Sequence, residues 1–409
     1  MTKVLEGVRV VEVSAWAFVP SAGAVLADWG AEVIKVEPPD GDPIRGLVNA
    51  GVGPLEGIVF PWEIWNRGKR GIALDLNHPD AQEIVLRLVE DADVFLTSYL
   101  PPTRRKLGID VDVVRARNPQ IIYASGTGQG PQGPEAEKGG YDSITFWSRG
   151  GVSAAVTPPG HPRPLGQPVG AFGDSVSGMA LAGGIAAALV KKARTGEGSL
   201  VDGSLLGTAM WMMQMGIVGA AAAAAMPAAP PAGMPTGGGM RIFNALVNNY
   251  RTSDDRWVAL CMLQPDRYWE GLCRAIGRDD MVTDPRFASS ADRTAHGADF
   301  VGELEKTFAS KPLDHWRQAL ATQPGQWDVV NHLTDLPRDP QARINGFVQD
   351  VEYGNGRQLT LIASPVQFDR TPPRLSPAPE FGADTEDLLA SLGMDADKII
   401  EAKVSGAVI

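Results

Sequence analysis

The sequence predicts an α/β protein whose N-terminal part is built on a parallel sheet with helices on both faces. Over the first 125 residues, helix signals alternate with short apolar, β-branched runs at 8–13, 32–36, 71–76, 94–96 and 121–124. Strands that alternate with helices in this way are typical of a parallel sheet buried on both faces. The turn SAWAFVPSAGA after the first run lacks G-x-G-x-x-G, and the chain has no GxxxxGK[ST] string, so the pattern indicates neither a nicotinamide nor an ATP site.

Residue spacing predicts the helices of this region. Small residues favour a helix over 21–29, and GMALAGGIAAAL at 178–189 predicts a second helix that a neighbouring backbone can approach closely. The segment 79–93 has apolar residues at i, i+3, i+4, i+7 and i+8, the stripe of a helix that lies on a core. They are Ala81, Ile84, Val85, Leu88 and Val89.

The second half of the chain is organised differently. No charged residue occurs from Leu205 to Ala229, which is long enough to cross a bilayer. Alanine contributes little to insertion and no Lys/Arg cluster flanks the stretch, so we expect a helix that is buried or bridges subunits. RWVALCML at 256–263 predicts a strand, GNG at 354–356 a hairpin, and 384–400 a helix that breaks at Gly393.

Length and these changes of pattern suggest the domain organisation. The 409 residues correspond to roughly two to three domains. We predict a large domain over 1–204, a linker helix with a Gly/Pro loop over 205–240, a small domain over 241–330, and a return segment over 331–409 that completes the large domain.

The composition predicts a globular, cytoplasmic protein. Hydrophobic residues make up 44% and charged residues 21%, and the net charge is −11 from 37 basic and 48 acidic residues, which argues against a nucleic-acid partner. Cys261 and Cys273 form neither a disulfide scaffold nor a CxxC motif, and the N-terminus resembles no secretory leader. We therefore predict no metal, no nucleic-acid partner and no membrane attachment.

Several strings point to one known family. They are LEGVRVVEVSAWAFVPSAGAVLADWGAEVIKVEPPDGDPIR (5–45), NRGKRGIALDL (66–76), DVFLTSYLPPTRRKLGID (93–110), NPQIIYASGTGQGP (118–131), GGYDSITFWSRGG (139–151), FGDSVSGMALAGGIAAAL (172–189), RTGEGSLVDGSLL (194–206) and GADTEDLLASLG (382–393). In order and spacing they resemble family III CoA-transferases, the group that includes formyl-CoA transferase, carnitine CoA-transferase and α-methylacyl-CoA racemase. The resemblance implies a Rossmann-like large domain that binds coenzyme A and a small α/β domain, in an interlocked homodimer.

Asp174 is the candidate nucleophile. In the family that the chain resembles, the aspartate of a GD-x-x-x-G string attacks the acyl-CoA thioester, and the resulting anhydride becomes an aspartyl-CoA thioester. A carboxylate can store an acyl group as an anhydride, so one difficult exchange is divided into easier steps. A structural alternative is that Asp174 is the N-cap of a helix over 175–189.

Tyr141 and Asp142 distinguish the two chemistries of that family. Its racemase branch resembles GHD at this place, with the His as a base, whereas this chain has Gly140-Tyr141-Asp142. A tyrosine with an ordinary pKa of about 10 is a poor base at neutral pH. The transferase branch resembles a Tyr followed by a carboxylate beside the nucleophile, which favours transfer. The structural alternative is that Tyr141 is a half-buried core aromatic.

The resemblance also implies places for coenzyme A and for the acyl group. Basic and polar residues at the family's CoA-binding positions are Lys69, Arg70, Ser98, Tyr99, Arg104, Arg105, Lys106 and Lys138. Trp16, Ala17 and Phe18 stand where relatives often have a polar residue, which suggests a bulkier or less polar acyl group than formyl or oxalyl. Gly237, Gly238 and Gly239 resemble the family's glycine lid, and a plain linker is the alternative.

The predicted function is transfer of CoA between an acyl-CoA and a free carboxylic acid through Asp174, an activity of the EC 2.8.3 type. Two other hypotheses stay open at this point: an α-methylacyl-CoA racemase or epimerase, and a non-catalytic acyl-CoA-binding protein. The absent His counts against the first, and the presence of Asp174 counts against the second.

Overall fold

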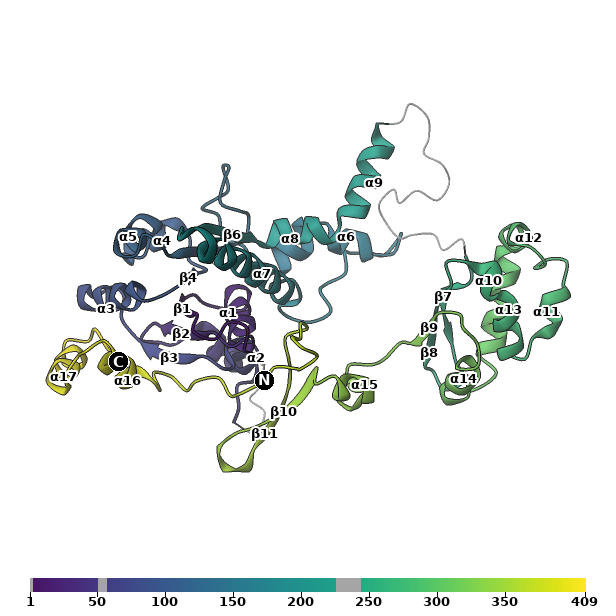
Figure 1. Cartoon of the computed structure of the whole chain (residues 1–409). Coiled ribbons are helices and arrows are strands. Elements are labelled where there is room, and N and C mark those ends of the chain that lie inside the picture. Colours follow the sequence, from purple (N-terminus) through teal and green to yellow (C-terminus); the bar gives the residue numbers. More distant parts are fainter. Residues whose placement is uncertain (1–2, 51–56, 226–243) are drawn as a thin grey trace. The chain divides into compact units, whose positions relative to one another are not determined.

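The computed structural model describes residues 3–50, 57–225 and 244–409 (Figure 1). Contacts between Cα atoms divide these residues into two compact units. The first unit holds the described residues up to Ala224 together with Asp339–Ile409, and the second holds the described residues from 244 to Arg338. The chain therefore leaves the first unit and later returns to it.

A six-stranded sheet forms the centre of the first unit. Its strands, in spatial order, are β3 (Arg70–Ala73), β2 (Glu32–Glu37), β1 (Arg9–Val13), β4 (Val94–Thr97), β5 (Ile122–Thr127) and β6 (Leu200–Ser204). Every neighbouring pair is parallel. This is the strand order of a Rossmann sheet, so the predicted α/β class with a Rossmann-like parallel sheet is confirmed.

Helices cover both faces of this sheet, and alternate residues of each strand face different cores. In β1, Val11 and Val13 join one core and Val10 joins the other. The first core is closed by α3 (Pro79–Glu90), α5 (Val111–Arg117), α16 (Thr385–Ser391) and α17 (Ala396–Val404). The second is closed by α1 (Phe18–Asp28), α7 (Phe172–Thr195) and α8 (Leu205–Met212). The apolar stripe predicted for 79–93 is the buried face of α3.

The helix α7 contains the predicted small-residue segment and packs closely on α1. A Cβ atom at Gly178 would lie 1.7 Å from the Ser21 hydroxyl oxygen, so only glycine allows this approach. By length and apolar composition α7 is the one single helix among the described residues that could cross a membrane, and the bent pair Leu205–Met212 and Gln214–Ala224 passes the same test only if it is taken as one span. The α7 residues Leu181, Ala182 and Ile185 are part of the second core, and 39% of the apolar segment of α7 is buried.

We predicted a single helix for the uncharged stretch that begins at Leu205. This prediction is wrong, because the stretch forms two helices. α8 ends at Met212 and α9 (Gln214–Ala224) continues at an angle of 72° to it. Met213 caps α8 between the two, and neither Pro nor Gly marks the break. Residues 226–229 of the predicted helix and the following Pro/Gly loop lie outside the described residues.

The returning segment supplies a hairpin and completes one edge of the sheet. β10 (Val348–Glu352) and β11 (Gln358–Ile362) pair antiparallel across Gly354–Gly356, as predicted. At the edge strand β3, the Gly71 N–H donates to Asp384 Oδ2 at 2.8 Å, and Leu74 forms a bridge with Val408. The predicted C-terminal helix breaks at Gly393, whose φ is +76°.

The other helices of the first unit are shorter. They are η1 (Pro43–Ala50), α2 (Phe60–Asn66), α4 (Pro101–Lys106), the π-helix η2 (Ser143–Arg149), α6 (Val152–Val156), α15 (Pro340–Ile344) and η4 (Gly354–Gly356).

The second unit has its own core. A three-stranded antiparallel sheet has the order β7 (Val247–Arg251), β8 (Trp257–Cys261) and β9 (Trp327–Val329), so the strand predicted from RWVALCML is confirmed. Helices pack on it around Tyr250, Phe308 and Trp316. They are α10 (Pro265–Ala275), α11 (Asp279–Thr283), α12 (Ser290–Ala295), α13 (Gly297–Phe308) and α14 (Leu313–Leu320), and η3 (Leu336–Arg338) ends the unit.

Candidate active site

A cavity of about 260 Å³ lies at the carboxyl edge of the parallel sheet. Its walls come from the segments that follow β1, β4 and β5, together with 139–141 and Leu205. The strand order reverses between β1 and β4, and sheets of this kind bind ligands at that point. The lining residues are Ala15, Trp16, Phe18, Ser98, Tyr99, Leu100, Thr103, Gly126, Thr127, Gly128, Gly139, Gly140, Tyr141 and Leu205.

Two aromatic side chains form one wall of this cavity. The rings of Trp16 and Tyr141 meet edge to face, with centroids 5.8 Å apart and planes at 87°. Trp16 is 38% exposed and Tyr141 is 59% exposed, so both present apolar surface to a ligand. Ala17 is buried instead in a cluster with Trp62 and Trp65, and does not line the cavity.

Asp174 lies in the first turn of α7. The N-cap of this helix is Ala171, so the prediction that Asp174 caps a helix over 175–189 is wrong. The helix begins before Asp174 because the Ala171 backbone turns into it with a left-handed φ of +58°. The carboxylate of Asp174 is half-buried and has no hydrogen-bond or ion-pair partner among the described residues. Burial, and then the negative charge of Asp142, raise the pKa of Asp174 to about 7.

Asp142 is the second carboxylate of the site and is buried. Its Oδ2 accepts a hydrogen bond from the backbone N–H of Gly173 at 2.9 Å, and Gly173 is the residue that precedes Asp174 in the chain. Burial raises the pKa of Asp142 above its usual range. The neighbouring Tyr141 lines the cavity, so Asp142 connects the cavity wall to the turn that carries Asp174.

Gly173 has no room for a side chain. A Cβ atom there would lie 2.2 Å from the Phe146 ring and 2.6 Å from Asp142 Oδ1. The glycine before Asp174 is therefore required for the contact between Asp142 and the start of α7.

Gly173→Ala is expected to lower the predicted CoA-transfer activity at least about tenfold, because the Phe146 ring and the Asp142 carboxylate must move to admit the methyl group, which disturbs the Asp142–Gly173 hydrogen bond. Gly183→Ala on the same helix is the matched control, since nothing lies within 4 Å of its Cβ position. That control should keep full activity and melt at the same temperature or higher, because Ala favours a helix. Equal activity of the two variants would contradict this explanation.

Three of the predicted CoA-binding cations are engaged inside the first unit. The Lys69 ammonium has no exposed surface, lies 2.7 Å from Glu12 Oε2, and has its pKa lowered by burial to about 8. Arg70 pairs with Glu32 and Asp384 at the edge of the sheet. Arg104 pairs with Asp110 and lies over the Tyr123 ring.

The other three predicted cations lie at the surface. Arg105 and Lys138 form exposed ion pairs with Glu137 and Glu135, and such pairs are weak enough to exchange for a phosphate. Lys106 is exposed and follows Thr103, a cavity residue, by one helical turn. Gly237, Gly238 and Gly239 lie outside the described residues.

The sequence reasoning missed several lining residues, namely Leu100, Thr103, Gly126–Gly128, Gly139 and Leu205. For most of them a signal was available, because they lie at or shortly after the carboxyl ends of β4 and β5, which meet at one edge of the sheet. Among residues 3–50, 57–225 and 244–409, no group of three or more His, Cys, Asp or Glu side chains is placed to hold a metal ion.

A Rossmann-order sheet with a cavity at its strand reversal is typical of α/β proteins that bind ligands there; Tyr141 lines this cavity, whereas its chain neighbour Asp142 and Asp174 are not among the lining residues. A sequence model described as CoA-transferase family III matches residues 5–385, so the chain belongs to this family and is an enzyme of the CoA-transferase class. It is similar to (R)-2-hydroxy-4-methylpentanoate CoA-transferase of Clostridioides difficile, with 33% identity over 99% of both chains.

Two further relatives agree with this assignment. Cinnamoyl-CoA:phenyllactate CoA-transferase of Clostridium sporogenes is 29% identical, over 98% of this chain and 96% of the relative. The crystal structure of a CAIB/BAIF family protein from Brucella suis has a TM-score of 0.81 at 28% identity, and covers 96% of this chain and 100% of that one. None of these names favours a racemase or a non-catalytic binder.

Proposed function

We propose that this CoA-transferase exchanges CoA between an acyl-CoA and a free carboxylic acid through covalent intermediates on Asp174. The observation that carries the proposal is the unpartnered, half-buried carboxylate of Asp174 in the first turn of α7. Buried carboxylates elsewhere in the unit, such as Glu12 and Asp28, are held by cations. A carboxylate with a raised pKa and no partner is a stronger nucleophile than an ion-paired one.

The proposed reaction has four acyl-transfer steps and balances without a proton. An Asp174 oxygen attacks the donor thioester carbon, the C–S bond breaks, and CoA leaves as thiolate from a mixed anhydride. The thiolate attacks the Asp174 carbonyl carbon, which releases the donor acid and leaves an aspartyl-CoA thioester. The acceptor carboxylate displaces the thiolate to give a second anhydride, and the thiolate then attacks the acceptor carbonyl and frees Asp174.

Asp142 and Tyr141 have supporting roles in this proposal. Asp142 is too buried to reach a substrate and holds the turn before Asp174 through Gly173. Its negative charge also raises the pKa of the nucleophile. Tyr141 lines the cavity beside Trp16 and contacts the substrate.

For the substrate we propose a CoA ester with a bulky, apolar acyl group. The aromatic pair at the cavity wall favours such a group, and two relatives are named for 2-hydroxy-4-methylpentanoate, cinnamoyl and phenyllactate substrates. The CoA phosphates are assigned to the exposed cations Arg105, Lys106 and Lys138, with Ser98 and Tyr99 along the cavity wall.

Trapping of the intermediate tests this function. The protein is incubated in D₂O with a panel of acyl-CoAs, treated with hydroxylamine and analysed by peptide mass spectrometry. We expect a hydroxamate on Asp174 and no deuterium at the acyl α-carbon. Deuterium in the recovered acyl-CoA without an adduct on Asp174 would instead establish a racemase.

The activity should depend on pH in the acid range. Asp174 must be ionised to attack, so activity is present above its pKa of about 7 and is lost below it. We expect kcat/KM to fall about tenfold per pH unit below that value. Asp142→Asn removes the charge that raises this pKa, so its acid limb should move to lower pH, whereas Tyr141→Phe should not move it. An acid limb that stays in place in Asp142→Asn would contradict the assigned interaction.

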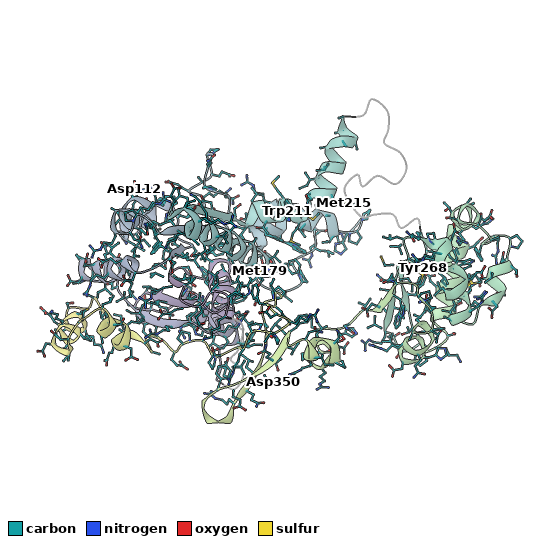
Figure 2. The ribbon with its side chains drawn as sticks, in the orientation of Figure 1. Asp112, Met179, Trp211, Met215, Tyr268 and Asp350 are labelled. Carbon is teal, nitrogen blue, oxygen red and sulfur yellow. The ribbon has the colours of Figure 1, made fainter. Side chains whose placement is uncertain are left out.

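We also propose that the chain is a homodimer. The end of α8 and the start of α9 expose large apolar side chains, with Trp211 at 71% and Met215 at 78% (Figure 2). Light scattering at micromolar concentration should give twice the mass of one chain. Met215→Glu is expected to shift the equilibrium towards monomer, and Lys398→Glu on the exposed side of α17 should not. A mass of one chain at every concentration would contradict the proposed homodimer.

A further inference from the structure

Trp16 has a backbone conformation that its side chain disfavours. Its φ is +70°, in the left-handed region that glycine adopts and that bulky residues avoid. Such a conformation persists only where the surroundings determine it, and it is found most often at functional sites. Trp16 also lines the cavity, in the segment that follows β1, and its ring contacts the ring of Tyr141.

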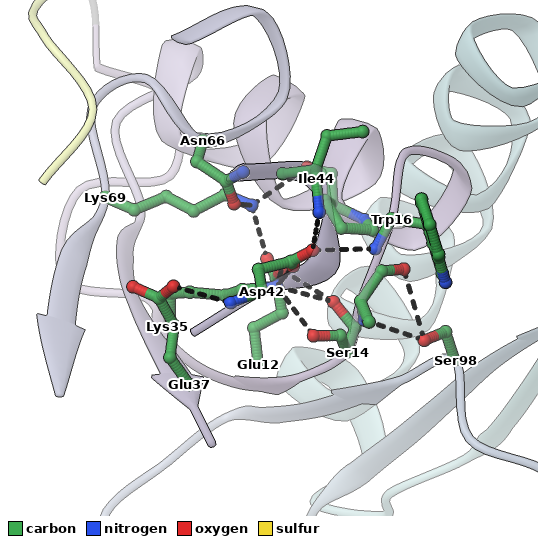
Figure 3. A network of polar contacts seen from close by, with 12 residues as sticks. Glu12, Ser14, Trp16, Lys35, Glu37, Asp42, Ile44, Asn66, Lys69 and Ser98 are labelled. Atoms are coloured by element: carbon green, nitrogen blue, oxygen red, sulfur yellow. Dashed lines mark hydrogen bonds and ion pairs between the residues drawn. The ribbon is translucent and has the colours of Figure 1, made fainter. Parts of the chain in front are cut away.

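Three side chains from three different segments hold the backbone around Trp16 (Figure 3). The Lys35 ammonium on β2 donates to the Ser14 carbonyl oxygen at 2.7 Å. The Ser98 hydroxyl, after β4, accepts from the Ala15 N–H at 2.9 Å. Asp42 Oδ1, before η1, accepts from the Trp16 N–H at 3.1 Å. Each of three consecutive residues thus has a backbone group fixed from outside the segment.

Asp42 is itself held in place. Its Oδ2 lies 2.9 Å from Lys35 Nζ, and its Oδ1 also accepts from the Ile44 N–H at 3.0 Å. Lys35 lies 3.2 Å from Glu12 Oε1, and Glu12 pairs in turn with Lys69. All four of these charged side chains are fully buried. A charge-assisted hydrogen bond from such a network is stronger and better directed than one from a solvated carboxylate.

We propose that Asp42 is a positioning residue that holds Trp16 in its left-handed conformation and so sets which acyl groups the cavity accepts. Trp16 contacts the substrate and Asp42 acts through it, without contact to the reacting atoms. The part of this proposal that concerns the choice of acyl group rests on the proposed function. With Trp16 held edge to face against Tyr141, the wall is a rigid aromatic surface that stabilises a bulky apolar acyl group and does little for a short one.

The first test needs no substrate. Hydrogen–deuterium exchange is measured for the peptide that contains Ser14 to Phe18 in the wild type, Asp42→Asn and Asp42→Ala. Asp28→Asn is the matched control, because Asp28 also forms a buried ion pair, with Arg67, and does not contact the Trp16 segment. We expect exchange of the Trp16 amide to be at least about tenfold faster in the Asp42 variants and unchanged in the control. Unchanged exchange in Asp42→Ala, which removes the acceptor oxygen altogether, would overturn the proposal.

The second test is a double-mutant cycle with Trp16→Gly, since glycine adopts a positive φ without strain. For Asp42→Asn, kcat/KM should fall about tenfold with 3-phenylpropionyl-CoA and less than about twofold with acetyl-CoA, mainly through KM. In the Trp16→Gly background, Asp42→Asn should cause no further loss. Equal losses with both donors, or a full loss in the glycine background, would show that Asp42 does not act through Trp16. A wild type that exchanges neither donor would overturn the proposed function, and the hydrogen-exchange test would still decide the role of Asp42.

Discussion

Asp174→Asn is expected to abolish CoA exchange, with kcat at least about a thousandfold below the wild type. Asn has the shape of Asp, but its amide cannot form the anhydride or the aspartyl-CoA thioester. Initial rates with any active donor and acceptor pair measure the effect. No adduct should form at position 174 in the variant, and its mass must show that the amide has not reverted to Asp.

Asp174→Asn should leave the protein folded, so the expected loss of activity can be attributed to the missing nucleophile. Because the pKa of Asp174 is raised to about 7, the folded state disfavours its charged form, and stability falls as the pH rises from the ordinary value towards 7. Asn removes that cost, so at pH 8 the variant should unfold at the same urea concentration as the wild type or at a higher one. Activity above a tenth of the wild-type value would exclude Asp174 as the nucleophile.

Lys35→Met is expected to lower the free energy of unfolding by about 3–5 kcal/mol. Lys35 is the cation shared by the buried carboxylates of Glu12 and Asp42, and these carboxylates raise its pKa although burial by itself lowers it. Methionine fills a similar volume and removes the cation that pairs with Asp42 Oδ2 and the donor to the Ser14 carbonyl, so the buried charge of Asp42 is no longer compensated by Lys35. Urea unfolding, followed by circular dichroism, measures the loss.

Two further variants separate the buried charge from side-chain packing. Lys191→Met removes an exposed pair with Glu197 and should change stability by less than about 0.5 kcal/mol. Asp42→Asn, added to Lys35→Met, removes the uncompensated charge and should restore part of the lost stability. A loss below about 1 kcal/mol in Lys35→Met alone would mean that the network contributes little to stability.

The parallel sheet could be predicted because its strands are buried on both faces and are therefore short continuous apolar runs, such as Val94–Leu96. The helix over 79–93 could be predicted because one face carries all of its apolar residues. The break at Met213 could not be predicted, because the stretch around it is uncharged on every side and contains no Pro or Gly at the break.

For the candidate site, too, some features could be predicted from the sequence and others could not. Tyr141, Asp142 and Asp174 could be proposed from motifs, since the chemistry requires those residue types. The inward orientation of Lys69 could not be predicted, because its partner Glu12 comes from another strand and only the fold brings the two together. The left-handed backbone of Trp16 could not be predicted either, because the intrinsic preference of tryptophan opposes it.

The edge of the sheet has a consequence for folding during synthesis. β3 is translated early, but Asp384, which accepts a hydrogen bond from the Gly71 N–H of this strand, is translated 313 residues later. Until then this edge has unpaired backbone groups, the kind of surface that recruits other chains in partly folded proteins. We therefore expect that deletion of residues 384–409 yields aggregated protein, and that nascent chains of this enzyme depend on chaperones until the last segment has left the ribosome.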